Sequence, residues 1–248
     1  MIISVLIPPE DRLGPHCETS AWRDAFSAKY VVVRVCRSWY NSCIDRLYQH
    51  IHLNRIAQIP RLVRTLEKSG AKDLARFIQR LDLNFFFPIG WERLYCQDFR
   101  RLLCLCPSIR EMDHTLIFDA KPQLDPVIYA TLAVFLDNIT YLRLGHDETS
   151  FEVQCRLIST LTTLRELDFH PGILDECPED YTHKFTANLP HLSSLTISLR
   201  NGTWESIWYL TLWAIPSIRR LSVTIDSKSW AWVPLQIIQL LPGLCAST

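Results

Sequence analysis

The chain has 248 residues, of which 48% are hydrophobic and 21% are charged, values typical of a folded protein with a sizeable core. Basic and acidic residues balance at 26 each, so no overall field draws the chain toward nucleic acid or an anionic membrane. Only 7 glycines are present and no Walker or dinucleotide phrase occurs, which argues against a Gly-rich phosphate-binding design.

The amino-terminal stretch 1–7 is apolar but short, lacks a basic flank and ends at Pro8 and Pro9. We therefore predict no signal peptide, and the apolar stretch at 208–215 is too short to span a bilayer. Nine cysteines without a secretory signal indicate free thiols in a reducing compartment. The expected location is the cytoplasm or the nucleus, with no membrane partner.

One sequence unit recurs along the chain: an apolar residue, two variable residues, an apolar residue, one variable residue and a final apolar residue. Its middle apolar positions are 81, 112, 142, 167, 195 and 221, so the steps are 31, 30, 25, 28 and 26 residues. Such steps lie at or slightly beyond the long end of the leucine-rich-repeat range of roughly 20–29 residues. The copies lie at 78–83, 109–114 (a degraded copy), 139–144, 164–169, 192–197 and 218–223.

Helical patterns separate these units. Asp125 with Pro126 forms an N-cap and first turn, Thr149 to Glu152 has capping-box spacing, and Thr203 also precedes an apolar stripe. A strand and a helix per unit cannot bury their apolar sides alone, but stacked units can. The prediction for 54–248 is an α/β leucine-rich-repeat solenoid with parallel strands on the concave face and helices outside. The alternative is an ordinary α/β domain with coincidental strand spacing.

Residues 34–39 read Arg-Val-Cys-Arg-Ser-Trp, and a Leu-Tyr phrase follows at 47–48. This pattern resembles the C-terminal half of an F-box, as found in F-box and leucine-rich-repeat proteins of mushroom-forming fungi (basidiomycete type). The resemblance covers 31–83 well and 1–120 loosely. The Ile-Pro-Pro-Glu phrase at 7–10 is similar to the opening of such modules, whereas Gly14 and Pro15 break the expected first helix. It implies a small helical F-box-like segment at 1–53 with a degenerate first half.

The resemblance also implies a partner and a surface. Pro8, Pro9, Val35 and Leu47 would meet the Skp-type adaptor of a cullin-RING ubiquitin ligase, while Cys36 and Trp39 would pack inside the module or against the first repeat. The repeats would then hold an unknown protein substrate. This implies the substrate-recruiting subunit of a Skp/cullin/F-box ligase.

The expected substrate-binding surface is the concave face, where the variable positions that flank each middle apolar residue point away from the core. Its mixture of charges and hydroxyls suits a protein or peptide better than a nucleotide or a lipid. The predicted residues are Arg80, Asp82, Asn84, Tyr141, Arg143, Glu166, Asp168, His170, Ser194, Thr196, Ser198, Arg220, Ser222 and Thr224.

No catalytic residue, cofactor or metal is predicted. Cys104, Cys106 and His114 are too few and too widely spaced for a zinc site. Residues 54–80 carry seven basic and two acidic residues, a net charge of +5. Nucleic-acid binding there is an alternative, but we interpret the charges as the solvated face of a helix, because apolar residues form a matching stripe.

Three functions stay open at this point: the ligase subunit, a leucine-rich-repeat binding protein without adaptor binding, and an enzyme whose site the sequence does not reveal. A further unit opens at 240–244, but the chain ends at Thr248. We therefore expect truncated carboxyl-terminal repeats, with residues after Ser227 poorly packed.

Overall fold

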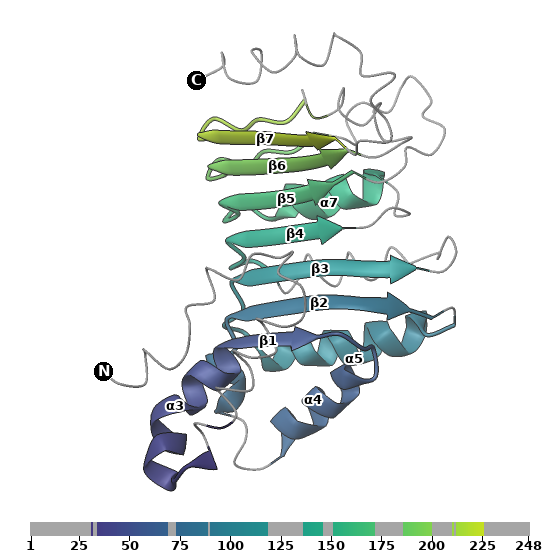
Figure 1. Ribbon diagram of the computed structural model, residues 1–248. Helices are drawn as coiled ribbons and strands as arrows, with labels where there is room; N and C mark the ends of the chain where they lie inside the picture. The colour runs from purple at the N-terminus through teal and green to yellow at the C-terminus, as the bar shows by residue number, and fades with distance from the viewer. Residues whose placement is uncertain are drawn as a thin grey trace.

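Seven parallel strands form one open sheet in the computed structural model, and their spatial order equals their order in the sequence (Figure 1). The described residues are 31, 34–68, 73–88, 90–118, 136–145, 151–171, 186–199, 210 and 212–225. The strands are β1 (His50–Leu53), β2 (Arg80–Phe87), β3 (Glu111–Phe118), β4 (Tyr141–Gly145), β5 (Glu166–His170), β6 (Ser194–Leu199) and β7 (Arg220–Ile225).

Helices fill part of the connections, as parallel strands require. They are α3 (Arg37–Gln49), α4 (Gln58–Glu67), the 3-10 turn η2 (Leu74–Phe77), α5 (Glu92–Leu105) and α7 (Phe151–Thr160). Helices α5 and α7 lie behind the sheet, α4 packs beside α5, and α3 leads into the edge strand β1 (Figure 1). The fold is therefore α/β, with described helices on one face of a parallel sheet.

The sequence period sets which residues face each other across the sheet. Leu81, Met112, Leu142, Leu167, Leu195 and Leu221 are paired in one continuous row, so the predicted middle apolar positions lie on adjacent strands. Even the degraded copy takes its place as β3. The prediction of neighbouring parallel strands is confirmed.

Every strand from β2 to β7 begins with the same backbone turn. The first apolar residue of each unit donates its amide to the carbonyl of an apolar residue three positions earlier, as Ile139 does to Leu136 at 3.0 Å. The carbonyl between turn and strand then accepts two successive amides of the next unit. Arg110 O, for example, accepts Thr140 N at 2.8 Å and Tyr141 N at 3.1 Å. The first apolar residue of the unit thus belongs to the turn and not, as the pattern suggested, to the strand.

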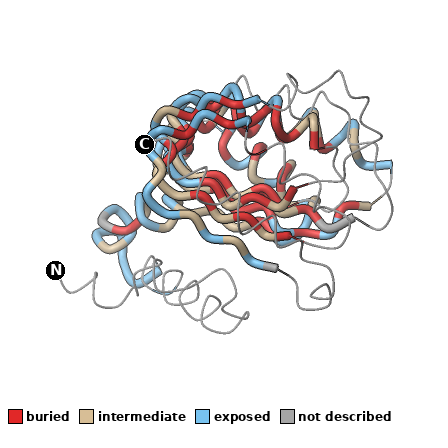
Figure 2. Tube along the Cα trace, turned by 90° about the horizontal axis from the view of Figure 1, so that it is seen from above, coloured by how far each residue is buried: buried red, intermediate tan, exposed pale blue. Residues whose placement is uncertain are grey.

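These turns and strands supply four inward positions per unit, and almost all are buried. Buried residues gather between the strand layer and the layer that contains the helices (Figure 2). The four positions are 75, 78, 81 and 83 in the β2 unit; 106, 109, 112 and 114 in β3; 136, 139, 142 and 144 in β4; 161, 164, 167 and 169 in β5; 189, 192, 195 and 197 in β6; and 215, 218, 221 and 223 in β7.

Two strands differ from the sequence prediction. Strand β1 falls inside the segment expected to be helical, although Ile51 pairs with Leu81 and so lies one 30-residue step before it. Strand β3 is a full strand even though His114 occupies an apolar position. Burial of that imidazole is tolerated because its Nε2 is hydrogen-bonded to the Tyr95 hydroxyl at 2.8 Å.

Two of the helical patterns in the sequence correspond to described helices. Helix α7 begins two residues after Thr149, and α4 buries Ile59, Val63 and Leu66 while its arginines stay exposed, as the solvated-face interpretation predicted. The helix expected after 125, most of the helix expected after 203 and the packing of residues after Ser227 lie outside the described residues; Leu210, in the second of these helices, is helical and buried. In the described part of the chain no helix is long and apolar enough to cross a bilayer.

Truncating the central apolar row should destabilise the whole sheet. Leu142 is fully buried in β4, and Leu142→Ala is expected to lower the free energy of unfolding by about 2–5 kcal/mol through lost transfer energy and a cavity. Urea denaturation followed by circular dichroism measures the change. Ser222→Ala, on the exposed side of β7, is the control and should stay within about 0.5 kcal/mol of the unmodified chain. Equal effects would contradict the assigned register.

Candidate functional site: the polar face of the sheet

The sheet presents three rows of side chains on the face turned away from α5 and α7, which we call the polar face. Alternation along each strand and the parallel register together create these rows. The first row is His50, Arg80, Glu111, Tyr141, Glu166, Ser194 and Arg220; the second is His52, Asp82, Asp113, Arg143, Asp168, Thr196 and Ser222; the third holds Asn84, Thr115, Gly145, His170, Ser198 and Thr224.

All fourteen residues predicted for the substrate-binding surface lie on the polar face. The prediction missed the members from β1 and β3, namely His50, His52, Glu111, Asp113 and Thr115. The repeat spacing could have found them, because His52 and Asp113 occupy the same register position as Asp82. At one row position a larger residue would crowd its neighbour: a Cβ on Gly145 would lie 3.0 Å from the side chain of Thr115 on the neighbouring strand.

An arginine between two aspartates organises the centre of the polar face. Arg143 Nη1 lies 3.5 Å from Asp113 Oδ2, and Arg143 Nε lies 3.2 Å from Asp168 Oδ2. The Arg143 side chain is only 12% exposed. Because the three residues come from adjacent strands, the parallel register brings the opposite charges together. The guanidinium is thereby held in place between two carboxylates.

A second cluster surrounds Asp82 near the β1 edge. His50 Nε2 donates to Asp82 Oδ2 at 2.5 Å, and Arg80 Nε donates to Asp82 Oδ1 at 3.0 Å. Arg80 also donates to Glu111 Oε2 at 3.3 Å, and its guanidinium lies 5.7 Å from the centre of the Tyr141 ring. Arg80 therefore links three strands. Tyr141, one of the residues predicted for the substrate-binding surface, is already engaged by this cation.

The two neighbouring aspartates have opposite pKa shifts. Burial by itself would raise the pKa of Asp82, but the hydrogen bond from His50, the neighbouring His52 ring and the charge of Arg80 outweigh it and hold that pKa well below its usual range. For Asp113, burial raises the pKa, and the Thr115 hydroxyl and Arg143 offset it only in part. Burial, together with Asp113 and Asp168, raises the pKa of Tyr141 to about 12.

The polar face is thus richest in charge from β1 to β5, whereas β6 and β7 contribute hydroxyl-bearing residues and Arg220. Within the described residues no group of three or more His, Cys, Asp or Glu is arranged to hold a metal ion. Cys104 is exposed and Cys106 is buried, with burial raising the thiol pKa of Cys106 to about 12. The cysteines in the described ranges are free. What the polar face offers is a preorganised array of charges, amides and hydroxyls.

The segment around α3 carries the residues that the resemblance linked to an adaptor. Val35 is 58% exposed just before α3, and Leu47 is half-buried on it. Trp39 is half-buried, but Cys36 is exposed, so the expectation that Cys36 packs inside the module is wrong. Pro8 and Pro9 lie outside the described residues. Val31 and Tyr40 are also exposed, an apolar set that sequence reasoning did not single out.

Comparison with known proteins assigns no family to this chain: no protein-family model matches it, and no curated protein matches it significantly. Its function is therefore inferred from the polar face and from the segment around α3. The two features are joined at one edge of the sheet, because α3 leads directly into the edge strand β1 (Figure 1).

Asp82 and Asp113 lie opposite each other on neighbouring strands, and replacing one or the other by asparagine should change the stability of the fold in opposite directions. Because the pKa of Asp82 is lowered by folding, its carboxylate stabilises the folded state above the unfolded pKa of about 4 and loses this effect as the pH falls. Asp82→Asn should therefore cost about 1–3 kcal/mol at pH 7, and less in acid.

Asp113→Asn is the matched control on the next strand. Its raised pKa means that ionisation opposes folding above about pH 4, so the amide should leave stability at pH 7 unchanged or higher. The difference from the unmodified chain should vanish as the pH falls. Urea denaturation at pH 7, 5 and 3 measures both variants. Parallel losses in the two variants would contradict the opposite shifts.

Proposed function

We propose that this chain is a leucine-rich-repeat solenoid that serves as a protein-interaction scaffold, with a protein partner held on the polar face. The observation that carries the proposal is the polar face itself, seven strands wide and in unbroken register. At a strand separation of about 4.8 Å, seven strands extend about 29 Å, a width suited to a protein surface.

The repeat pattern supports the solenoid interpretation. Units of 25–31 residues each contribute one strand, the same turn and the same doubly bonded carbonyl. Stacked units of this kind bury a continuous core and leave one side chain row after another open to a partner. Fixed charges on such a surface favour a partner of complementary charge and suppress others.

We further propose that the partner on the polar face is a substrate recruited for ubiquitin transfer, and that the α3 segment docks the Skp-type adaptor. Exposed Val31, Val35 and Tyr40 supply an apolar surface beside α3. Helix α3 continues directly into β1, and Cys43 on α3 is buried. An adaptor on this segment would therefore be rigidly linked to the sheet.

Adaptor binding can be tested with one charge. Val35→Asp should abolish co-purification of the chain with a co-expressed Skp-type adaptor, because an apolar contact would become a buried carboxylate. The matched control is Asn41→Asp, which adds the same charge at an exposed position of α3. Retention of the adaptor by Val35→Asp would refute the docking surface. An unmodified chain that never holds the adaptor would leave the alternative, a repeat scaffold without adaptor binding.

The scaffold proposal has its own test, independent of the adaptor. A photo-crosslinking residue at Ser222 or Asn84, both exposed on the polar face, should capture the same protein from cell extract. The same probe at Arg64, exposed on α4, is the control and should not capture that protein. If the Arg64 probe captures the same partner as efficiently, or if the two polar-face probes never share a partner, the polar face is not the binding surface.

A further inference from the structure

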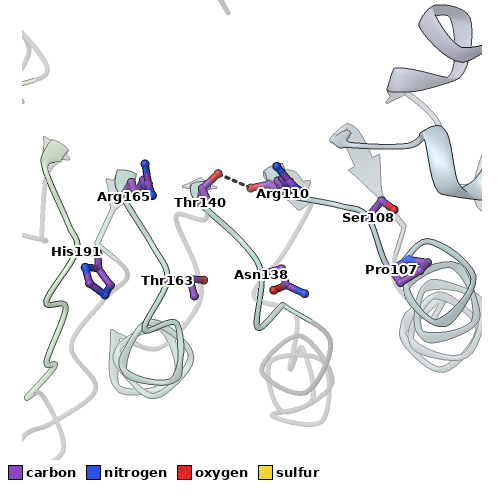
Figure 3. Close-up of a pocket in the computed structure, with 8 residues that line it drawn as sticks. All are labelled: Pro107, Ser108, Arg110, Asn138, Thr140, Thr163, Arg165 and His191. Carbon is purple, nitrogen blue, oxygen red and sulfur yellow. Dashed lines mark hydrogen bonds between the residues drawn. The ribbon is translucent and has the colours of Figure 1, made fainter.

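A groove runs along the edge of the sheet where strands β3 to β6 begin. It has a volume of about 560 Å³ and crosses four successive units (Figure 3). Arg110, Thr140 and Arg165 form one row at the strand starts, and Asn138, Thr163 and His191 form a second row on the preceding turns (Figure 3).

The repeat explains why these residues gather. Each is the immediate neighbour of a buried turn residue, Ile109, Ile139, Leu164 or Leu192. When those apolar side chains point into the core, the residues on either side point outward. Backbone bonds then fix the first row, because Thr140 N donates to Arg110 O at 2.8 Å and Arg165 N donates to Thr140 O at 2.9 Å.

The groove is positively charged. Its lining includes Arg110 and Arg165 and, among the residues that the structure describes, contains neither Asp nor Glu. Both arginines are exposed, and within the described part of the chain no carboxylate lies within the 4.0 Å of an ion pair from either guanidinium. The acidic residues that follow them, Glu111 and Glu166, belong to the first row of the polar face and are not among the lining residues of the groove.

The two threonine hydroxyls in the groove are used internally. Thr140 Oγ1 donates to Arg110 O at 3.2 Å, the bond drawn in Figure 3, and Thr163 Oγ1 donates to Asp137 O at 2.7 Å and to Ile139 O at 2.9 Å. The donors left to meet a ligand are then chiefly the two guanidinium groups, with Asn138 and His191 beside them. Guanidinium groups of this kind bind carboxylates or phosphates in a bidentate way.

We propose that this groove binds an acidic, extended peptide segment of a protein partner. Arg110 and Arg165 stand two strands apart, so their backbones are separated by about 10 Å, which three residues of an extended peptide span. A nucleic acid strand fits less well, because the described lining residues include no Phe, Tyr or Trp on which bases could stack. The groove shares no residue with the polar face, so this proposal can be tested independently of the scaffold proposal.

The test uses the full chain and a fluorescein-labelled peptide of twelve glutamates, with binding followed by fluorescence anisotropy. Arg110→Gln/Arg165→Gln should weaken binding about tenfold or more, because two charge-assisted contacts are lost. Arg61→Gln/Arg64→Gln is the matched control: it removes two exposed arginines from α4 and leaves the groove intact. The control should weaken binding less than about twofold, which is the scale of a screened, long-range charge effect.

Three outcomes would overturn the proposal. One is no binding of the glutamate peptide by the unmodified chain. Another is an equal or larger loss in the α4 control, which would move the site to the basic helix. The third is equal binding of a labelled twelve-residue oligothymidylate, which would make the groove a site for nucleic acid or for polyanions in general. Thermal denaturation of all variants verifies that each remains folded.

Discussion

The structure depends on a backbone arrangement that recurs at the start of each strand. One carbonyl accepts two successive amides of the next unit, from Gln79 O just before β2 through Arg110 O and Thr140 O to Ser193 O just before β6. Because the acceptor is a fixed backbone atom, a strand cannot slip by one residue without losing both bonds. A slip would also turn its apolar residues outward. Register is therefore secured twice, by hydrogen bonds and by burial.

Because the register is fixed, residues at equivalent positions of successive units line up and form a continuous surface. A residue that varies between units is placed beside its counterparts from units about 30 residues away, at the separation of neighbouring strands. On the polar face this produces ion pairs such as Arg143 with Asp113 and Asp168. At the strand starts the same register lines up Arg110 and Arg165 without intervening carboxylates. One periodic backbone thus carries a charge-balanced face and a basic edge.

The proposed functions use these surfaces in different ways. Charges on the polar face are mostly paired with one another, so they would give a partner orientation and selectivity more than raw affinity. The guanidinium groups of the groove are available to a ligand. The apolar residues beside α3 lie next to the β1 edge and would leave both surfaces accessible while an adaptor is docked. A scaffold with three separate contact regions could hold an adaptor and an extended substrate together.

The sequence by itself determined the period, the parallel strands around Leu81, Leu142, Leu167, Leu195 and Leu221, and the side chains that leave the core, because apolar spacing is a local property. It missed β1, a four-residue strand inside a helical pattern, and it undervalued β3, where burial of His114 depends on Tyr95. Only the tertiary structure decided that the pKa values of Asp82 and Asp113 shift in opposite directions, and that Arg110 and Arg165 share a groove. Both outcomes depend on neighbours some 30 to 55 positions away, which become neighbours only through the register of the sheet.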